Sequence, residues 1–166
     1  LFGLINLFAR SLGGYFGDRF GKIGGLNGRV KWLFVALFME GLALILFSRM
    51  DTIPLIIMSL IFFSLFVQMS EGATYSVVPF INKKALGMVS GIVGAGGNAG
   101  AVAGMLLFKK QLTGLEWTDS FYVLGFIVLG VSFSSFLVRF SNTAEFAAPA
   151  AHKEVTVENT LLPTLS

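Results

Sequence analysis

The sequence predicts an all-α integral membrane protein, on the basis of its composition and of one recurring pattern. Hydrophobic residues make up 55% of the 166 residues and charged residues only 13%, whereas a typical soluble domain has about 25% charged residues. Such a chain cannot cover a water-exposed surface with polar groups. Apolar stretches close to the ~20 residues that a helix needs to cross a bilayer also recur along the chain.

Five stretches are predicted to form membrane-spanning helices: residues 1–16, 32–47, 53–81, 86–108 and 120–140. The first opens directly on apolar residues, without Met and without the basic segment and cleavage site of a signal peptide. We therefore expect a fragment whose first helix is missing its beginning. Residues 141–166 are polar and rich in Ala and Thr, which predicts a disordered tail.

Basic residues in the connections predict the orientation of these helices. Residues 17–31 carry four basic residues against one acidic residue, and Lys83 and Lys84 follow the third predicted helix, whereas the other two connections are nearly balanced. Short cytoplasmic loops are enriched in Lys and Arg. We therefore expect both basic connections and the tail to face the cytoplasm, with the plasma membrane as the location.

The residue types argue against several functional classes. The chain has no Cys and one His, His152 in the polar tail, so we expect neither thiol chemistry nor a metal site. The net charge of +3 follows membrane topology rather than a nucleic-acid surface. A membrane enzyme would need clustered His, Asp or Cys, and a channel would need a continuous polar pore face. We expect neither class, and we expect no cofactor.

A glycine-rich stretch, residues 91–104, contains six Gly and one Asn. Residues 94–99 fit the loose dinucleotide pattern G-x-G-x-x-A. That site requires a strand and a βαβ unit, whereas the flanks here are apolar helix, so we interpret the stretch as the middle of a spanning helix. Gly94 and Asn98 share one stripe of that helix, and small residues let backbones approach closely. Asn98 either hydrogen-bonds a substrate or ties two helices together.

Polar side chains at membrane depth are candidate functional residues because they are costly there. Arg10 lies eight residues before Asp18, which places it roughly 12 Å inside a hydrocarbon core about 30 Å thick. Its guanidinium stays charged and presents a planar fork of donors. We favour anion binding by Arg10 over a structural salt bridge. Asn6 shares the same face of this helix one turn earlier.

The third predicted helix carries a polar stripe that includes Gln68, Glu71 and Tyr75. A carboxyl group in an apolar environment favours its neutral form, which suits a proton carrier. Glu71 equally suits a static partner for Arg10, and both interpretations stay open. Glu40, on the second predicted helix, has no polar companion on its own face, so we expect a structural role for it.

The residues after the first predicted helix form a known pattern. Gly14, Asp18, Arg19, Gly21 and Lys22 fit G-x-x-x-D-R-x-G-K, which resembles the cytoplasmic loop motif of the major facilitator superfamily. The resemblance implies that the glycine permits tight helix contact. It also implies that the Asp and Arg of the motif form a charge latch that biases a two-state transporter.

Three segments together resemble the nitrate/nitrite porters, the high-affinity nitrate transporters of algae, fungi and plants. Residues 9–14, 72–80 and 91–100 look like the eighth, tenth and eleventh helices of that family. The resemblance implies a twelve-helix fold in two six-helix halves. Residues 1–140 would then form about five helices of the C-terminal half, and the N-terminal half of the same protein would be its partner in the bilayer.

The same resemblance implies a function and a binding site. The function is uptake of nitrate, and also of nitrite, by proton symport and alternating access, with an accessory subunit as a further partner. Arg10 corresponds to a substrate-binding arginine of the family and Asn98 to its signature asparagine, with Gly94 and Gly97 along the pathway. Because the family's remaining site residues are absent from this chain, we expect this chain alone to be inactive. The alternative is a porter for another small or organic anion.

Overall fold

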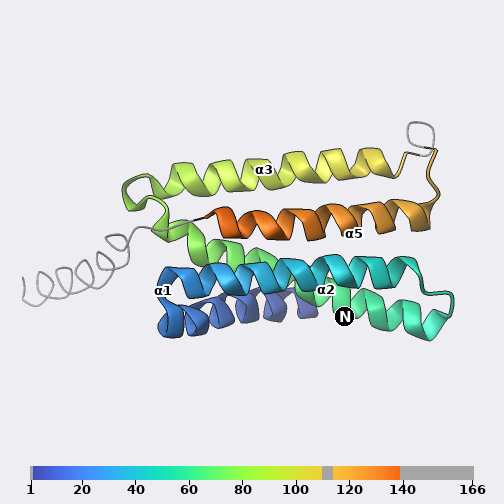
Figure 1. Cartoon of the computed structure of the whole chain (residues 1–166), viewed down its shortest axis with the longest axis horizontal. Coiled ribbons are helices and arrows are strands. Elements are labelled where there is room, and N and C mark those ends of the chain that lie inside the picture. The colour runs from blue at the N-terminus through green and yellow to red at the C-terminus, as the bar shows by residue number, and fades with distance from the viewer. Residues whose placement is uncertain (1, 110–113, 139–166) are drawn as a thin grey trace, which may run out of the picture.

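The computed structural model describes residues 2–109 and 114–138 (Figure 1). Its helices are α1 (Phe2–Ser48), α2 (Ile53–Val77), α3 (Leu86–Leu107) and α5 (Trp117–Ser134), with short 3₁₀ turns η1 (Val78–Phe80), η2 (Lys83–Ala85) and η3 (Ser135–Leu137). The predicted all-α membrane fold is confirmed. The four helices are long and apolar enough, by length and composition, to cross a membrane.

α1 consists of two helical arms that meet at Gly24 and Gly25. Gly24 has φ −126° and ψ 16°, and Gly25 has φ 60° and ψ −149°, a positive-φ conformation that glycine adopts at little cost. A straight helix of 47 residues would be roughly 70 Å long, more than twice the thickness of the hydrocarbon core. Instead the arms fold back on each other, so that α1 supplies two spans (Figure 1).

The long connection predicted over residues 17–31 is wrong, because helix continues through most of it. Only Gly24 and Gly25 leave the helical conformation, so the N-terminal arm runs over residues 2–23 and the C-terminal arm over residues 26–48. Lys and Arg are good helix formers, although they are unfavourable in hydrocarbon. The basic residues of this segment therefore do not mark the end of a helix.

Two other predicted boundaries also shift. The span predicted over residues 53–81 ends as an α-helix at Val77 and continues as η1, because Pro79 has no backbone N–H to donate and restricts the residue before it. The span predicted over residues 120–140 begins three residues earlier, at Trp117, with Asp119 in its first turn, where an acidic side chain is favourable. Residues 139 and 140 and the predicted tail lie outside the described residues.

The N-terminal arm of α1 and α2 contact each other backbone to backbone. A Cβ atom built on Gly72 would lie 2.1 Å from the carbonyl oxygen of Arg10, and one built on Gly13 would lie 2.2 Å from that of Met69. Both distances are far shorter than any real Cβ contact. The two glycines therefore allow an approach that no other residue would permit.

The buried cluster next to this contact joins three helical segments. Ala9, Trp32, Met69 and Ala73 are its members, from the two arms of α1 and from α2. The indole N–H of Trp32 donates to the carbonyl oxygen of Gly13 at 3.0 Å. This hydrogen bond satisfies the only polar atom of the Trp32 side chain, and it joins the two arms of α1.

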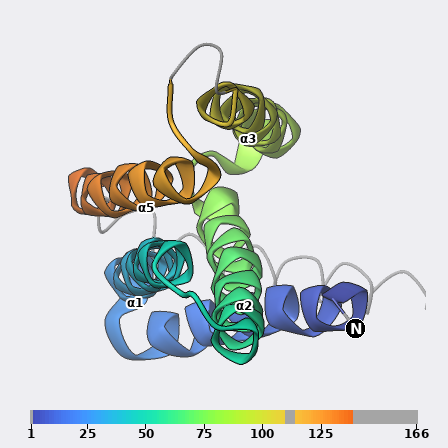
Figure 2. The same ribbon diagram turned by 90° about the vertical axis from the view of Figure 1, so that its right-hand side faces the viewer.

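α5 packs on the C-terminal arm of α1, and α3 stands apart (Figure 2). Cβ atoms built on Gly41 and Gly125 would each lie 3.0 Å from the other residue's carbonyl oxygen, so these helices also approach closely. Phe34 on α1 adds ring contacts to Phe133 and Phe136. None of the residues of α3 is buried within the described structure.

The close contact at Gly72 predicts an unequal effect of two Gly→Ala substitutions in the full-length protein. Gly72→Ala forces the backbones of α1 and α2 apart, at a cost of about 1–3 kcal/mol. Gly130→Ala on α5 is the matched control, because a Cβ atom there has no neighbour within 4 Å in the described structure. Thermal denaturation of the purified protein should show a lower midpoint for Gly72→Ala only. Equal midpoints would contradict the close packing.

Candidate functional site

A cavity of about 610 Å³ lies between α2 and α3. Its walls are Val67, Glu71, Thr74 and Tyr75 from α2 and Val93, Gly94, Gly97 and Asn98 from α3. Five of the residues singled out in the sequence thus share one space, although they come from two separate motifs. The α3 wall is smooth at its glycines, and the side chain of Asn98 supplies an amide.

Arg10 reaches this cavity through two of its wall residues. Its Nη2 atom donates to Glu71 Oε1 at 2.5 Å, and its Cζ atom lies 5.5 Å from the centre of the Tyr75 ring. The Arg10 and Glu71 side chains remain 49% and 43% exposed, so the pair is open to the space beside it. The sequence left two roles open for Glu71, a proton carrier and a partner of Arg10. In the structure Glu71 is the ion-pair partner of Arg10.

The ion pair leaves hydrogen-bonding capacity for a ligand. A guanidinium carries five N–H donors, and the contact with Glu71 uses one terminal nitrogen. The hydroxyl oxygen of Tyr75 lies close to the α3 wall, 3.9 Å from where a Cβ atom on Gly94 would be. The cavity wall therefore holds one carboxylate, one amide and one phenol, and Arg10, which is not itself a wall residue, contacts the carboxylate and the phenol. This set can bind a small anion and balance its charge.

Asn6 and Gln68 lie elsewhere. Asn6 Oδ1 accepts a hydrogen bond of 3.1 Å from the hydroxyl of Ser64, which ties the start of α1 to α2. Gln68 is partly buried on α2, and neither residue belongs to the wall of the cavity as described. The structure thus brings Glu71 and Tyr75 of the polar stripe to the site and leaves Gln68 outside it.

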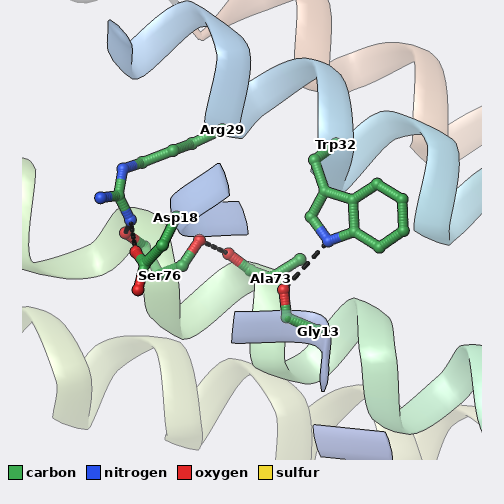
Figure 3. A network of polar contacts seen from close by, with 6 residues as sticks. All are labelled: Gly13, Asp18, Arg29, Trp32, Ala73 and Ser76. Atoms are coloured by element: carbon green, nitrogen blue, oxygen red, sulfur yellow. Dashed lines mark hydrogen bonds and ion pairs between the residues drawn. The ribbon is translucent and has the colours of Figure 1, made fainter. Parts of the chain in front are cut away.

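The loop-motif residues lie in the last turns of the N-terminal arm of α1, just before the turn at Gly24 and Gly25. Asp18 forms an ion pair with Arg29, on the opposite arm (Figure 3). Arg29 also donates to the backbone carbonyl oxygen of Ser76 at 3.1 Å, and its Cζ atom lies 4.7 Å from the centre of the Phe80 ring. One guanidinium therefore links both arms of α1 to the end of α2.

The glycines and basic residues of the motif surround this link. A Cβ atom on Gly21 would lie 2.7 Å from Arg29 Nε, and one on Gly14 would lie 4.0 Å from the carbonyl oxygen of Gly72. Arg19 and Lys22 line a second cavity of about 440 Å³ beside Asp18 and Arg29. Gly21 thus leaves room for the guanidinium, and Gly14 lies over the close contact of α1 with α2.

Three residues that join the helices could not be identified from the sequence. Arg29 resembles a loop charge there and Trp32 an apolar residue, and nothing in the sequence distinguishes Ser70. Ser70 contacts Glu40, since its hydroxyl lies 2.6 Å from Glu40 Oε2. The one signal for Arg29 in the sequence is that it is a basic residue on the far side of a Gly-Gly pair from Asp18. Glu40 has a polar companion after all, on another helix.

Comparison with known proteins places the chain in a family. It matches the model of the Major Facilitator Superfamily over residues 1–163. It is 34% identical to the High affinity nitrate transporter 2.5 of Arabidopsis thaliana, across 95% of this chain and 31% of that protein. It is also 34% identical to the Nitrate transporter 2.1 of Chlamydomonas reinhardtii, across 84% of this chain and 26% of that protein.

A cyanobacterial protein gives a similar match. The Nitrate/nitrite transporter NrtP of Picosynechococcus is 37% identical, across 61% of this chain and 18% of its own length. The chain therefore spans less than a third of the length of these relatives. No solved structure matches. With its helical membrane fold, its loop motif and these similarities, the chain belongs to the major facilitator superfamily and is similar to the nitrate/nitrite porters within it.

Proposed function

We propose that this chain is part of a porter that takes up nitrate, and also nitrite, with protons by alternating access. The observation that carries the proposal is the cavity between α2 and α3, at whose edge Arg10 contacts Glu71 and Tyr75. The printed names of the relatives support nitrate and nitrite as the anions. The chain's share of those proteins implies that the transporting unit contains an N-terminal half as well.

The chemistry of the cavity suits nitrate. Nitrate is planar and weakly hydrated, and the flat, weakly hydrated guanidinium of Arg10 matches it better than an ammonium group would. The amide of Asn98 and the hydroxyl of Tyr75 can each donate one further hydrogen bond. Gly94 and Gly97 add no side chain to the wall, which leaves the cavity wide enough for an anion to pass.

The pairing of Arg10 with Glu71 supports proton coupling. An anion that takes the guanidinium away from Glu71 leaves a carboxylate without its partner at membrane depth, where a lone charge is costly. A proton that binds Glu71 at that moment removes the charge. One anion and one proton would then enter the site together, and the net charge of the site would not change.

The proposal also covers the location and orientation of the whole transporter. The porter lies in the plasma membrane, with the end of the α1 hairpin and the C-terminal tail on the cytoplasmic side, and it works with an accessory subunit. The linked residues Asp18 and Arg29, in place of the Asp18 and Arg19 that the motif implies, act as the latch at the cytoplasmic end. By joining both arms of α1 to α2, the latch favours the conformation in which these three segments are held together.

The role of Arg10 is tested by Arg10→Lys in the full-length transporter. Lysine keeps the positive charge but lacks the paired N–H donors of the guanidinium. Loss of one hydrogen bond to a charged group costs about 1.5–3 kcal/mol. We therefore expect the KM for nitrate to rise by about tenfold or more, measured as uptake of labelled nitrate into proteoliposomes. Arg49→Lys, in the turn after α1, is the control and should keep the KM. If Arg10→Lys kept the nitrate affinity of the wild type, the proposed binding of nitrate by two N–H groups of Arg10 would be wrong.

The same uptake assay tests the substrate. Unlabelled nitrate and nitrite should compete with labelled nitrate, whereas organic anions such as formate or acetate should compete weakly. Stronger competition by a carboxylate than by nitrate would instead assign the cavity to a porter for organic anions.

Glu71→Gln tests the coupling step. The amide has nearly the shape of the carboxyl group but cannot bind the coupled proton, so we expect a pH gradient to stop driving nitrate accumulation while nitrate exchange continues. Uptake would be recorded at a series of external pH values. Unchanged pH dependence would remove Glu71 from the coupling mechanism.

The latch is tested by a double-mutant cycle. Arg29→Gln loses its contacts with Asp18, Ser76 and Phe80, so it should lower the thermal denaturation midpoint more than Asp18→Asn does. Because the two residues share one interaction, the double variant should be no less stable than Arg29→Gln alone. Arg19→Gln serves as the control of equal charge change. Strictly additive effects would show that Asp18 and Arg29 act separately.

A further inference from the structure

A second carboxyl group lies at membrane depth, away from the anion cavity. Glu40 is on the C-terminal arm of α1, about 21 Å from the start of that arm and about 12 Å from its end at Ser48. Its side chain is partly buried and meets the hydroxyl of Ser70 on α2. Glu40 is therefore a titratable group at the contact of α1 with α2, and neither the proposed anion site nor the latch uses it.

The charges around Glu40 are already paired with each other or lie at helix ends. On α2, the ionisable side chains are Glu71, which pairs with Arg10, and Tyr75. On α5, they are Asp119 in the first turn and Tyr122, whose ring lies 4.2 Å from the Cζ atom of Arg49. Within residues 2–109 and 114–138, the recorded ion pairs are Arg10–Glu71 and Arg29–Asp18. Glu40 thus has no cationic partner in the described part of the chain.

The remaining charged side chains of α1 lie near its hairpin turn. They are Asp18, Arg19, Lys22, Arg29 and Lys31. Lys31, the nearest of these along the C-terminal arm, is about 13 Å from Glu40 at the rise of a helix. Even this cation is therefore too far along the helix to neutralise the carboxyl group by direct contact.

The contacts of Ser70 leave room for a proton on Glu40. The Ser70 hydroxyl oxygen lies 2.6 Å from Glu40 Oε2 and 2.9 Å from the backbone carbonyl oxygen of Val67. A hydroxyl has one hydrogen and can also accept, so Ser70 can donate a full hydrogen bond to only one of these two oxygens. If Glu40 carries a proton, it donates to Ser70 Oγ, and Ser70 donates to Val67. Both short contacts are then satisfied.

We propose that Glu40 is a second proton-binding group of the transporter, a neutral acid in this conformation that contacts Ser70 where α1 meets α2. Ser70 directly precedes Glu71 on α2, so a movement of α2 that changes the Arg10–Glu71 pair also moves the acceptor of Glu40. Loss of the Glu40 proton would leave an unpaired carboxylate between α1 and α2, which would separate these helices. The inference rests on the proposed function for its place in a transport cycle, and its geometry is independent of that function.

Infrared difference spectroscopy on the full-length transporter in lipid tests the protonation state. The wild-type protein at neutral pH should show a carbonyl band of a protonated carboxylic acid that shifts in D₂O. The band should be lost in Glu40→Gln, be present in Glu40→Asp, and be unaffected in Asp51→Asn, the control carboxyl group in the exposed turn after α1. A band that persists unchanged in Glu40→Gln would overturn the proposal.

Nitrate uptake at a series of pH values tests the role in transport. Glu40→Gln mimics the neutral acid, so nitrate uptake at acidic pH should equal that of the wild type, and the decline of uptake at alkaline pH should become smaller, with the part that depends on Glu71 remaining. A purely structural role would leave the shape of the pH profile unchanged, and that result would overturn the transport role. A wild-type profile without any pH dependence would contradict proton coupling itself, while the infrared band would still decide whether Glu40 holds a proton.

Discussion

The contact between the N-terminal arm of α1 and α2 determines where the functional side chains of this protein lie. Gly13 and Gly72 bring two backbones together without any intervening side chain, with room for less than one Cβ atom at either position. Along this seam the guanidinium of Arg10 meets Glu71. Further along it, the carbonyl oxygen of Ser76 comes within reach of Arg29. A wider spacing between these helices would break both contacts.

The second constraint is the cost of charge in hydrocarbon. Within the described spans, the structure meets that cost with two ion pairs and one contact between a carboxyl and a hydroxyl group. Arg10 and Glu71 neutralise each other, Arg29 and Asp18 pair at the hairpin end, and Glu40 meets a hydroxyl group. A charge-balanced pair beside a cavity is poised to exchange partners, because an anion can replace the carboxylate and a proton can replace the guanidinium. The same electrostatic cost therefore explains both the stability of the resting site and its proposed activity.

Several features of the site could be predicted because they are local in the sequence. The polar stripe of α2 and the glycine stripe of α3 follow from helical periodicity, and both reach the same cavity. The partner of Arg10 could not be chosen from the sequence, since Glu71 is separated from it by 61 positions and by two helix reversals. The role of Arg29 depends on the turn at Gly24 and Gly25, whose sharpness charge patterning did not reveal. Ser70 could not be linked to Glu40 from the sequence, because the two residues lie on different helices and periodicity relates only residues of one helix.

By itself, the sequence determined the all-α membrane class, the approximate positions of its apolar spans and the superfamily, because composition, periodicity and short motifs need no knowledge of distant contacts. It also identified Arg10, Glu71 and Asn98 as unusual for their depth. Only the tertiary structure decided which of these residues meet. It placed Arg10 on Glu71, Arg29 on Asp18 and Ser70 on Glu40. The physical reason is that such pairs form between helices, and the distance between two helices is decided by the few positions, such as Gly13 and Gly72, where their backbones touch.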